Sequence, residues 1–379
     1  MTATPLPLWR KTLTCGTLSV TPDAGTIPLD DLFDVAERRN PKRAFLFVSK
    51  VLGRHIPVSP ATMRNVYRQL ADQFPPLSQG PVLFIGMAET AVGLGAGVFD
   101  EMRHRVSEGV YLSSTRHPVS GELLCEFKED HSHATDHLLY LPDDAELRRR
   151  VLEARTLVLI DDEATTGNTF INLLSALRND GGLSHIERVI TVTLTDWSGD
   201  AIAAACPLPV TTVALVRGDW HWEKNPDAPV PVMPAVNVTA SGSVAITGRQ
   251  NWGRLGMSTP LADLGLHIVA APGEKILILG TSEFIWPPFL LAERLEQQGA
   301  EVKYSSTTRS PIATGFAIQS AIAFSDNYGL GIPNFVYNVA HQQFDRILLC
   351  SETPAESIDP TLIEALGSVA PVVEVLSYE

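Results

Sequence analysis

The residues with the clearest chemical potential form one short segment, Asp161–Thr169, directly after the apolar run Leu157–Ile160. Two adjacent acids, Asp161 and Asp162, precede a hydroxyl-rich, glycine-containing stretch that leads into an expected helix. Carboxylates suit the hydroxyls of a sugar or a Mg²⁺ ion bound to it. Backbone N–H groups at a helix start suit a phosphate, because the positive end of the helix dipole lies there. The segment therefore predicts a pocket for a phosphorylated pentose.

The residues expected to surround the phosphate are small or carry hydroxyl groups. They are Ala164, Thr165, Thr166, Gly167, Asn168 and Thr169. No Gly-Lys-Ser/Thr follows, so this is not the phosphate loop of nucleotide triphosphatases. Glu163 is a third acid in the segment, and two roles remain open for it. It is either a structural group near the helix start or an extra contact to ribose or metal.

Alternating strands and helices must position this loop. We expect strands over Thr12–Val20, Ala44–Val51, Val82–Ile85, Val110–Ser113, Thr156–Ile160, Arg188–Leu194 and Val210–Val216. Helices are expected over Ser59–Phe74, Thr90–His104, Asp143–Ala154 and Thr169–Asn179. Such alternation predicts an α/β fold with a parallel sheet covered on both faces. Sheets of this kind bind ligands at the carboxyl ends of their strands, where the acid pair is placed.

The loop closely resembles the signature of type I phosphoribosyltransferases, which bind 5-phosphoribosyl-1-pyrophosphate (PRPP). The shared pattern is an apolar strand, two acids, two variable residues, Thr165, a small residue, Gly167 and a hydroxyl residue. The resemblance implies that Asp161 and Asp162 hold the ribose and that Ala164–Thr169 hold the 5-phosphate. It also implies Mg²⁺ bound mainly through PRPP, with the two aspartates as further candidate ligands. Glu163 departs from the family pattern, which usually has an apolar residue there.

The same resemblance implies a second loop that binds the diphosphate. It consists of Met87, Ala88, Glu89 and Thr90 after a strand, with Arg116 as a basic residue near the pyrophosphate. Two simpler interpretations stay open: a tight turn between strand and helix for the loop, and a surface ion pair for Arg116.

A polar, histidine-rich stretch, Glu129–His137, corresponds to the family's flexible loop, which closes over the reaction. Three interpretations are open: part of an active-site hood, an exposed loop, or a zinc site that includes His137. His131 and His133 are the candidates for a general base. Lys50 and His55, near the expected N-terminal strand, are candidates for the part of the hood that selects the acceptor.

An ordered self-similarity links the two halves of the chain. The segment Leu83–Glu89 parallels Ile278–Glu283, and Leu112–Pro118 parallels Ser305–Pro311. A third match pairs Leu157–Glu163 with Ile347–Glu352, in which the aspartate pair and Thr-Thr-Gly are missing. We infer a duplication whose second copy is degenerate. The alternative is that unrelated α/β units share strand–Gly–helix turns.

The whole chain resembles the phosphoribosyltransferases of bacterial tellurite-resistance-associated operons, which carry a C-terminal TRSP domain. The marks of that domain are Glu283 in a Gly-x-x-Glu segment and the residues Thr308, Arg309, Ser310 and Pro311. We expect a phosphoribosyltransferase domain over residues 1–217, a connector over 218–262 and a smaller α/β domain over 263–379. The second domain is expected to act as an intramolecular pseudo-dimer partner or a lid. Alternatively, Glu283, Arg309 and Asp326 form a polar site of their own.

Composition excludes several classes of protein. The 379 residues carry a net charge of −14, which argues against a nucleic-acid-binding surface. Four dispersed cysteines indicate a reducing compartment, and no apolar run is long enough to span a membrane, so a cytoplasmic location is expected. The expected partners are PRPP, an unknown nucleophilic acceptor and, in a homo-oligomer, further copies of the chain. The main rival to an enzyme is a regulatory protein that senses PRPP or a nucleotide without turnover.

Overall fold

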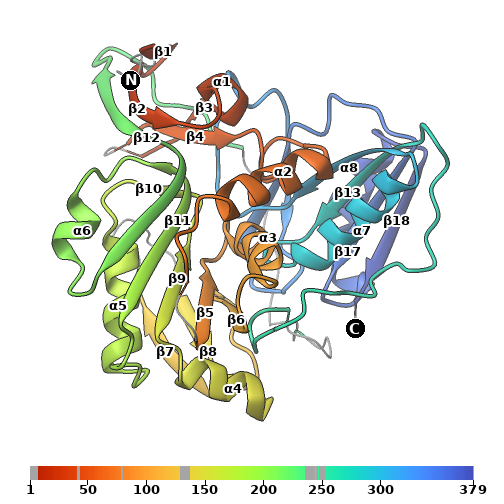
Figure 1. The fold of residues 1–379 in the computed structure, drawn as a ribbon. Coiled ribbons are helices and arrows are strands. Elements are labelled where there is room, and N and C mark those ends of the chain that lie inside the picture. Colours follow the sequence, from red (N-terminus) through yellow and green to blue (C-terminus); the bar gives the residue numbers. More distant parts are fainter. Residues whose placement is uncertain are drawn as a thin grey trace.

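The computed structural model describes residues 7–40, 43–77, 80–128, 137–234, 244, 246 and 252–378. Its strands are β1 (Trp9–Leu13), β2 (Gly16–Gly25), β3 (Phe33–Glu37), β4 (Phe45–Ser49), β5 (Pro81–Gly86), β6 (Glu108–Ser113), β7 (Leu123–Phe127), β8 (His137–Tyr140), β9 (Thr156–Ile160), β10 (Glu163–Ala164), β11 (Arg188–Asp196), β12 (Val210–Lys224), β13 (Lys275–Gly280), β14 (Glu301–Ser306), β15 (Ala321–Ser325), β16 (Pro333–Tyr337), β17 (Arg346–Ser351) and β18 (Val372–Ser377). Its helices are α1 (Leu29–Leu32), α2 (Pro60–Ala71), α3 (Val92–Met102), α4 (Ala145–Leu152), α5 (Asn168–Asn179), α6 (Ala201–Ala205), α7 (Trp286–Gln297), η1 (Ala355–Ser357) and α8 (Pro360–Gly367). Figure 1 shows two α/β units side by side, with the N-terminal strands over one end of the first.

The first sheet has eight strands in the order β1-β2-β12-β11-β9-β5-β6, with β10 beside β11. Strands β12, β11, β9, β5 and β6 run parallel, and β9 is buried along its whole length. One face packs against α2 and α3, and the other against α4, α5 and α6. The expected parallel α/β fold is confirmed. Numbered along the chain, the five parallel strands lie in the order 2-1-3-4-5, so the order reverses between β5 and β9, and we refer to the edge where these two strands end as the crevice.

The N-terminal lobe, β1–β4 with α1, differs from the sequence-based expectation. The single strand expected over Thr12–Val20 is the β1–β2 hairpin, and β2 pairs with β12. Strand β12 continues past a bulge at Arg217/Gly218 to Lys224, so the predicted boundary at residue 217 falls inside a strand. Trp220 and Trp222, two residues apart, both pack against Phe45 of β4. Residues two apart in a strand point to the same face, so both tryptophans reach the N-terminal lobe. The pairing of β12 with β2 extends the strand into the segment that we expected to be a connector.

Strands β7 and β8, for which no strand was predicted, come before and at the end of the polar stretch Glu129–His137 in the chain and form a further hairpin. Strands β7 and β8 pair antiparallel, and Leu124, Phe127 and Leu139 are buried against the α5 side of the sheet. Leu138 also exchanges two backbone hydrogen bonds with Thr115, both of 2.9 Å. The hairpin therefore extends from the end of β6 beside the crevice.

The second unit has a parallel four-stranded sheet in the order β14-β13-β17-β18. Numbered along the chain, its strands lie in the order 2-1-3-4, the same as the corresponding part of the first sheet. A hairpin, β15–β16, follows β14 as β7–β8 follows β6. The two units are therefore built on one topological plan.

Equivalent hydrogen bonds recur at equivalent positions of the two units. The amide of Ala88 donates to Ser114 Oγ, and the amide of Ser282 donates to Thr307 Oγ1, both at 2.8 Å. Thr308 exchanges two backbone bonds with Phe335 of β16, as Thr115 does with Leu138 of β8. Shared turns alone do not require matched side-chain bonds, so the geometry supports duplication.

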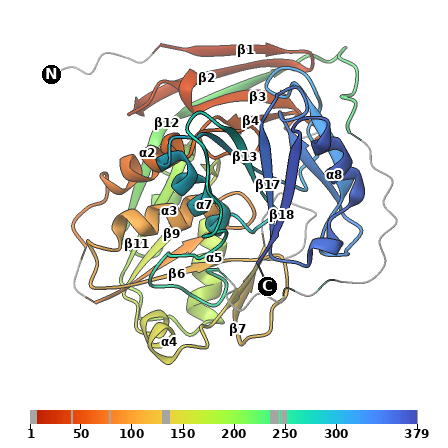
Figure 2. The ribbon, with the colours of Figure 1, turned by 90° about the vertical axis from the view of Figure 1, so that its right-hand side faces the viewer.

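The two units pack directly against each other. One apolar cluster contains Tyr67 of α2, Val92 of α3 and Phe289 of α7. Beside it, Arg64 Nε donates to Glu293 Oε1 at 2.7 Å, and its Nη1 donates to Asp100 Oδ2 at 2.7 Å. Figure 2 shows α2, α3 and α7 grouped together, and each of these helices contacts the other two. The second unit therefore shares part of its hydrophobic core with the first unit. No helix in the described parts of the chain is both long and apolar enough to cross a membrane.

Candidate active site

Two loops meet at the crevice where β5 and β9 end. Gly86, the last residue of β5, lies in register with Ile160, the last residue of β9, and Met87 N donates to Ile160 O at 3.0 Å. The loop over residues 87–91 and the loop over residues 161–167 therefore leave neighbouring strands at the same edge. This is the place where sheets of this topology bind ligands.

The acid pair begins the second loop, as the sequence predicted. Asp161 Oδ1 accepts a 2.9 Å hydrogen bond from the amide of Asp162, and both residues are partly buried. The backbone of Asp161 and Asp162 is tied to β11, through Val192 O and the Leu194 amide, at 3.0 Å each. These bonds hold both acids at the sheet edge.

The loop passes into α5 through Gly167, which has a left-handed backbone with φ 77°. A Cβ at this position would lie 2.2 Å from Ile202 Cγ1, so both conformation and space require glycine. The N-cap residue of helix α5 is Gly167, which has no side chain, and the amide of Asn168 donates a 3.4 Å hydrogen bond to Thr166 Oγ1. A helix start with a glycine N-cap next to hydroxyl side chains is a suitable phosphate site, because backbone N–H groups and the positive end of the helix dipole lie there.

Replacing Gly167 by alanine is expected to weaken ribose 5-phosphate binding by about tenfold or more, because the loop must shift to relieve strain of about 1–2 kcal/mol plus the clash with Ile202. Calorimetric titration would measure this affinity. Gly182→Ala is the matched control, because Gly182 also has a positive φ, 69°, but nothing lies within 4 Å of its added Cβ. Equal losses in the two variants would show that Gly167 does not shape a phosphate site.

Glu163 has a partner that neither of its two predicted roles included. Arg43 Nη2 donates to both carboxylate oxygens, at 2.8 and 3.2 Å, and Thr165 Oγ1 donates to Oε1 at 2.9 Å. The Arg43 guanidinium also lies over aromatic rings, 4.7 Å from the Phe45 centroid and 5.4 Å from that of Trp220. Glu163 therefore fastens this loop to the N-terminal lobe.

The loop after β5 is also held by side chains. Ser114 Oγ accepts the hydrogen bond from the Ala88 amide and lies 3.0 Å from His137 Nδ1. His137 is buried and stacks on Phe127 of β7. A cis peptide joins Ala88 to Glu89, and the Glu89 carboxylate forms an ion pair with Arg54. The amides of Met87 and Ala88 thus both have acceptors within the protein.

Family comparison decides the class of the protein. A family model described as phosphoribosyl transferase matches residues 32–219, and one described as TRSP domain C terminus to PRTase_2 matches residues 250–366. The chain belongs to the phosphoribosyltransferases. It is an enzyme of this family with a C-terminal TRSP domain, as the sequence predicted.

Similar solved structures include adenine phosphoribosyltransferases from Rhodothermus marinus and Trypanosoma brucei. The first is 17% identical with a TM-score of 0.32, covering 49% of this chain and 94% of that one. The second is 13% identical with a TM-score of 0.34, covering 50% of this chain and 81% of that one. An orotate phosphoribosyltransferase from Aeropyrum pernix is 16% identical with a TM-score of 0.27, covering 45% and 79%. No match was found among curated proteins.

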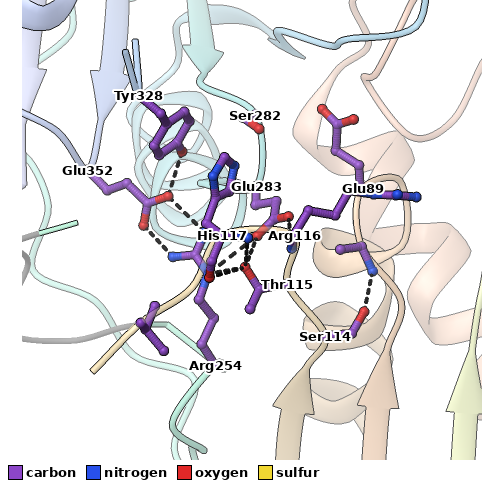
Figure 3. A network of polar contacts seen from close by, with 12 residues as sticks. Glu89, Ser114, Thr115, Arg116, His117, Arg254, Ser282, Glu283, Tyr328 and Glu352 are labelled. Carbon is purple, nitrogen blue, oxygen red and sulfur yellow. Dashed lines mark hydrogen bonds and ion pairs between the residues drawn. The ribbon is translucent and has the colours of Figure 1, made fainter. Parts of the chain in front are cut away.

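The TRSP domain meets the phosphoribosyltransferase domain through a buried polar network (Figure 3). Glu283 accepts hydrogen bonds from Thr115 Oγ1 at 2.6 Å and from the Arg116 amide at 2.8 Å. Arg254 lies between two acids, 2.9 Å from Glu283 Oε2 and 2.6 Å from Glu352 Oε2. Glu352 ends the third match of the repeat, whereas nothing in the local sequence marks Arg254 as a site residue.

The charges of this network are strongly coupled. Burial alone raises the pKa of Glu283, but His117, Arg254 and hydrogen bonds from Thr115 and Arg116 lower it to about 2. Burial alone lowers the pKa of Arg254, but Glu352 and Glu283 raise it well above its ordinary value. Arg254 is therefore a permanent cation at the position in the second sheet where β13 and β17 end. Glu352 follows β17 much as Asp162 follows β9, and its carboxylate is already occupied by Arg254.

The TRSP motif residues reach the same interface. Arg309 Nε lies 3.9 Å from Glu89 Oε2, and Thr308 Oγ1 accepts the Ser310 amide at 3.1 Å in the turn before Pro311. Asp326, which we considered for a separate polar site, accepts the amides of Tyr328, Leu330 and Ile332 at 2.8–3.1 Å and so holds its own loop. Glu283 and Arg309 thus belong to the boundary between the two domains.

The remaining predicted site residues lie in different settings. Lys50 Nζ donates to the Asp30 carbonyl at 2.6 Å on the outside of the N-terminal lobe. His55 is buried beside Tyr337 of the TRSP domain, and burial together with the nearby charge of Arg54 lowers its pKa to about 3. His131 and His133 lie outside the described residues. The roles proposed for these residues stay predictions.

Proposed function

We propose that the protein transfers the 5-phosphoribosyl group from PRPP to a base-like nucleophile and releases pyrophosphate. The observation that carries this proposal is the meeting of two loops at one crevice. One presents two carboxylates and the start of α5 with its glycine N-cap, and the other is the turn Met87–Thr90. These groups suit the 5-phosphate, the ribose hydroxyls and the diphosphate of one PRPP molecule.

In this proposal Asp161 and Asp162 hold the ribose hydroxyls, and residues 164–169 hold the 5-phosphate. Carboxylate oxygens suit Mg²⁺, and the described residues contain no cluster of three acids, cysteines or histidines that would hold a metal alone. Mg²⁺ would therefore be held mainly through PRPP, with Asp161 and Asp162 as the protein ligands. When bound, it neutralises charge on the diphosphate.

The diphosphate is proposed to lie against the turn Met87–Thr90, with Arg116 nearby. Because the Met87 and Ala88 amides already donate to Ile160 O and Ser114 Oγ, the ligand would meet the turn at Glu89 and Thr90. In the reaction the bond from ribose C1 to the diphosphate oxygen breaks, and a bond from C1 to the acceptor forms. The acceptor proton must pass to a base, for which His131 and His133 remain candidates.

The proposed biological role rests on the resemblance to tellurite-resistance-associated enzymes. We propose that the product is a nucleoside-like metabolite linked to stress response and that the enzyme works in the cytoplasm. The TRSP domain is proposed to act as an intramolecular partner in place of a second subunit.

A pyrophosphate-release assay with PRPP, Mg²⁺ and a panel of nitrogenous bases tests the proposed reaction. We expect release that depends on one class of base and stops when EDTA removes the metal. Tight PRPP binding without release by any base would contradict the transferase proposal and favour a sensor of PRPP. Absence of PRPP binding would contradict both.

A further inference from the structure

The two domains exchange contacts through their matching motifs. Glu283 of the TRSP domain contacts Thr115 and the Arg116 amide of the first domain. In the opposite direction, Glu89 of the first domain lies 3.9 Å from Arg309 of the TRSP domain. Since Glu89 corresponds to Glu283 and Arg116 to Arg309 in the repeat, the two contacts are approximately symmetric. Glu283 meets both the threonine and the arginine of the other copy, whereas Glu89 meets the arginine through its guanidinium group.

Glu89 is held by two arginines, and both depend on the TRSP domain. Arg309 belongs to that domain. Arg54 comes from the N-terminal lobe, but its Nη1 donates to Ser282 O at 2.7 Å and to Ser306 Oγ at 3.1 Å. The side chains of Arg54, Glu89 and Arg309 are only 4%, 12% and 16% exposed, so solvent screens their charges weakly.

This arrangement solves an electrostatic problem at the turn Met87–Thr90. A carboxylate next to a bound diphosphate repels it unless a cation compensates and holds the carboxylate aside. Two guanidinium groups on one carboxylate leave a net positive charge at the turn. Such preorganised charge favours a developing pyrophosphate anion.

We propose that Arg309 of the TRSP domain is a positioning residue for the diphosphate turn of the first domain, acting through Glu89. This inference rests on the proposed PRPP function. It makes the second domain a required part of the diphosphate site, although its own crevice is filled by Arg254.

Titration of the full-length Arg309→Ala variant with PRPP, pyrophosphate and ribose 5-phosphate tests the proposal. We expect the affinities for PRPP and pyrophosphate to fall about tenfold, because loss of a partly buried charge contact misplaces the turn. The affinity for ribose 5-phosphate, which has no diphosphate, should change less than about twofold, since the 5-phosphate loop is separate. A merely structural role would weaken all three ligands alike.

Arg346→Ala is the matched control. Arg346 is also in the TRSP domain, its side chain is equally 16% exposed, and it pairs with Glu274 away from the crevice. The Arg346→Ala variant should bind PRPP, pyrophosphate and ribose 5-phosphate with the same affinities as the wild-type protein. In a Glu89→Gln background, Arg309→Ala should have little further effect on PRPP affinity.

Three results would overturn the proposal: unchanged PRPP affinity in Arg309→Ala, equal weakening of all three ligands, or an undiminished loss in the Glu89→Gln background, which would mean direct contact with the ligand. Failure of the wild-type protein to bind PRPP would instead refute the proposed function itself.

Discussion

Replacing Asp161 and Asp162 together by asparagine should lower PRPP-dependent pyrophosphate release by roughly 10³-fold or more. Both carboxylates lie at the end of β9, where the proposed ribose and Mg²⁺ contacts need negative charge. The fold should persist, because asparagine has nearly the same shape as aspartate. Its side-chain oxygen at position 161 can still accept the hydrogen bond from the backbone amide of residue 162. The assay is single-turnover pyrophosphate release, with circular dichroism as the check on folding.

Asp143→Asn with Asp144→Asn provides a matched control that also removes two adjacent negative charges. Asp144 caps α4 by accepting the Leu147 amide at 2.9 Å, and asparagine caps a helix about as well. This variant should retain wild-type activity. Full activity in the Asp161/Asp162 variant would show that the mechanism proposed for the crevice is wrong.

Among the substitutions proposed for this protein, Arg254→Ala should lower the free energy of unfolding the most. Arg254→Ala leaves Glu283 and Glu352 buried and close together without their cation. Breaking a buried pair in this way typically costs about 3–5 kcal/mol of unfolding free energy. Because the network joins the two domains, we expect a fall in the calorimetric unfolding midpoint of at least about 5 °C at neutral pH.

Arg149→Ala is the comparison for that experiment, because Arg149 contacts three acids, Glu108, Glu146 and Glu153, but on the exposed face of α4. Surface ion pairs contribute little, so its midpoint should barely change. Adding Glu352→Gln to Arg254→Ala should recover part of the loss by removing one uncompensated charge. A midpoint for Arg254→Ala equal to that of wild type would show that the network does not hold the domains together.

The regular elements of the fold could be predicted from local patterns. The apolar run Thr156–Ile160 is β9, and the expected helix over Thr169–Asn179 is α5 with one more residue at its start. Less regular segments were missed. No strand was predicted at β7 or β8, and the strand predicted over Val210–Val216 continues as β12 to Lys224. In both cases distant residues supply the pairing, which local sequence does not show.

The sequence by itself determined the loop of acids, hydroxyls and glycine, because its strand, turn and helix start all depend on neighbours close in the chain. It also contained the repeat, since matching motifs keep their order and spacing. Only the tertiary structure decided what holds the loops. Glu163 pairs with Arg43 across 120 residues, and Arg254 pairs with Glu352 across 98. A charge that folding removes from water needs a partner of opposite charge, and residues far apart in the sequence supply it. Local sequence therefore does not predict which cation pairs with each buried acid.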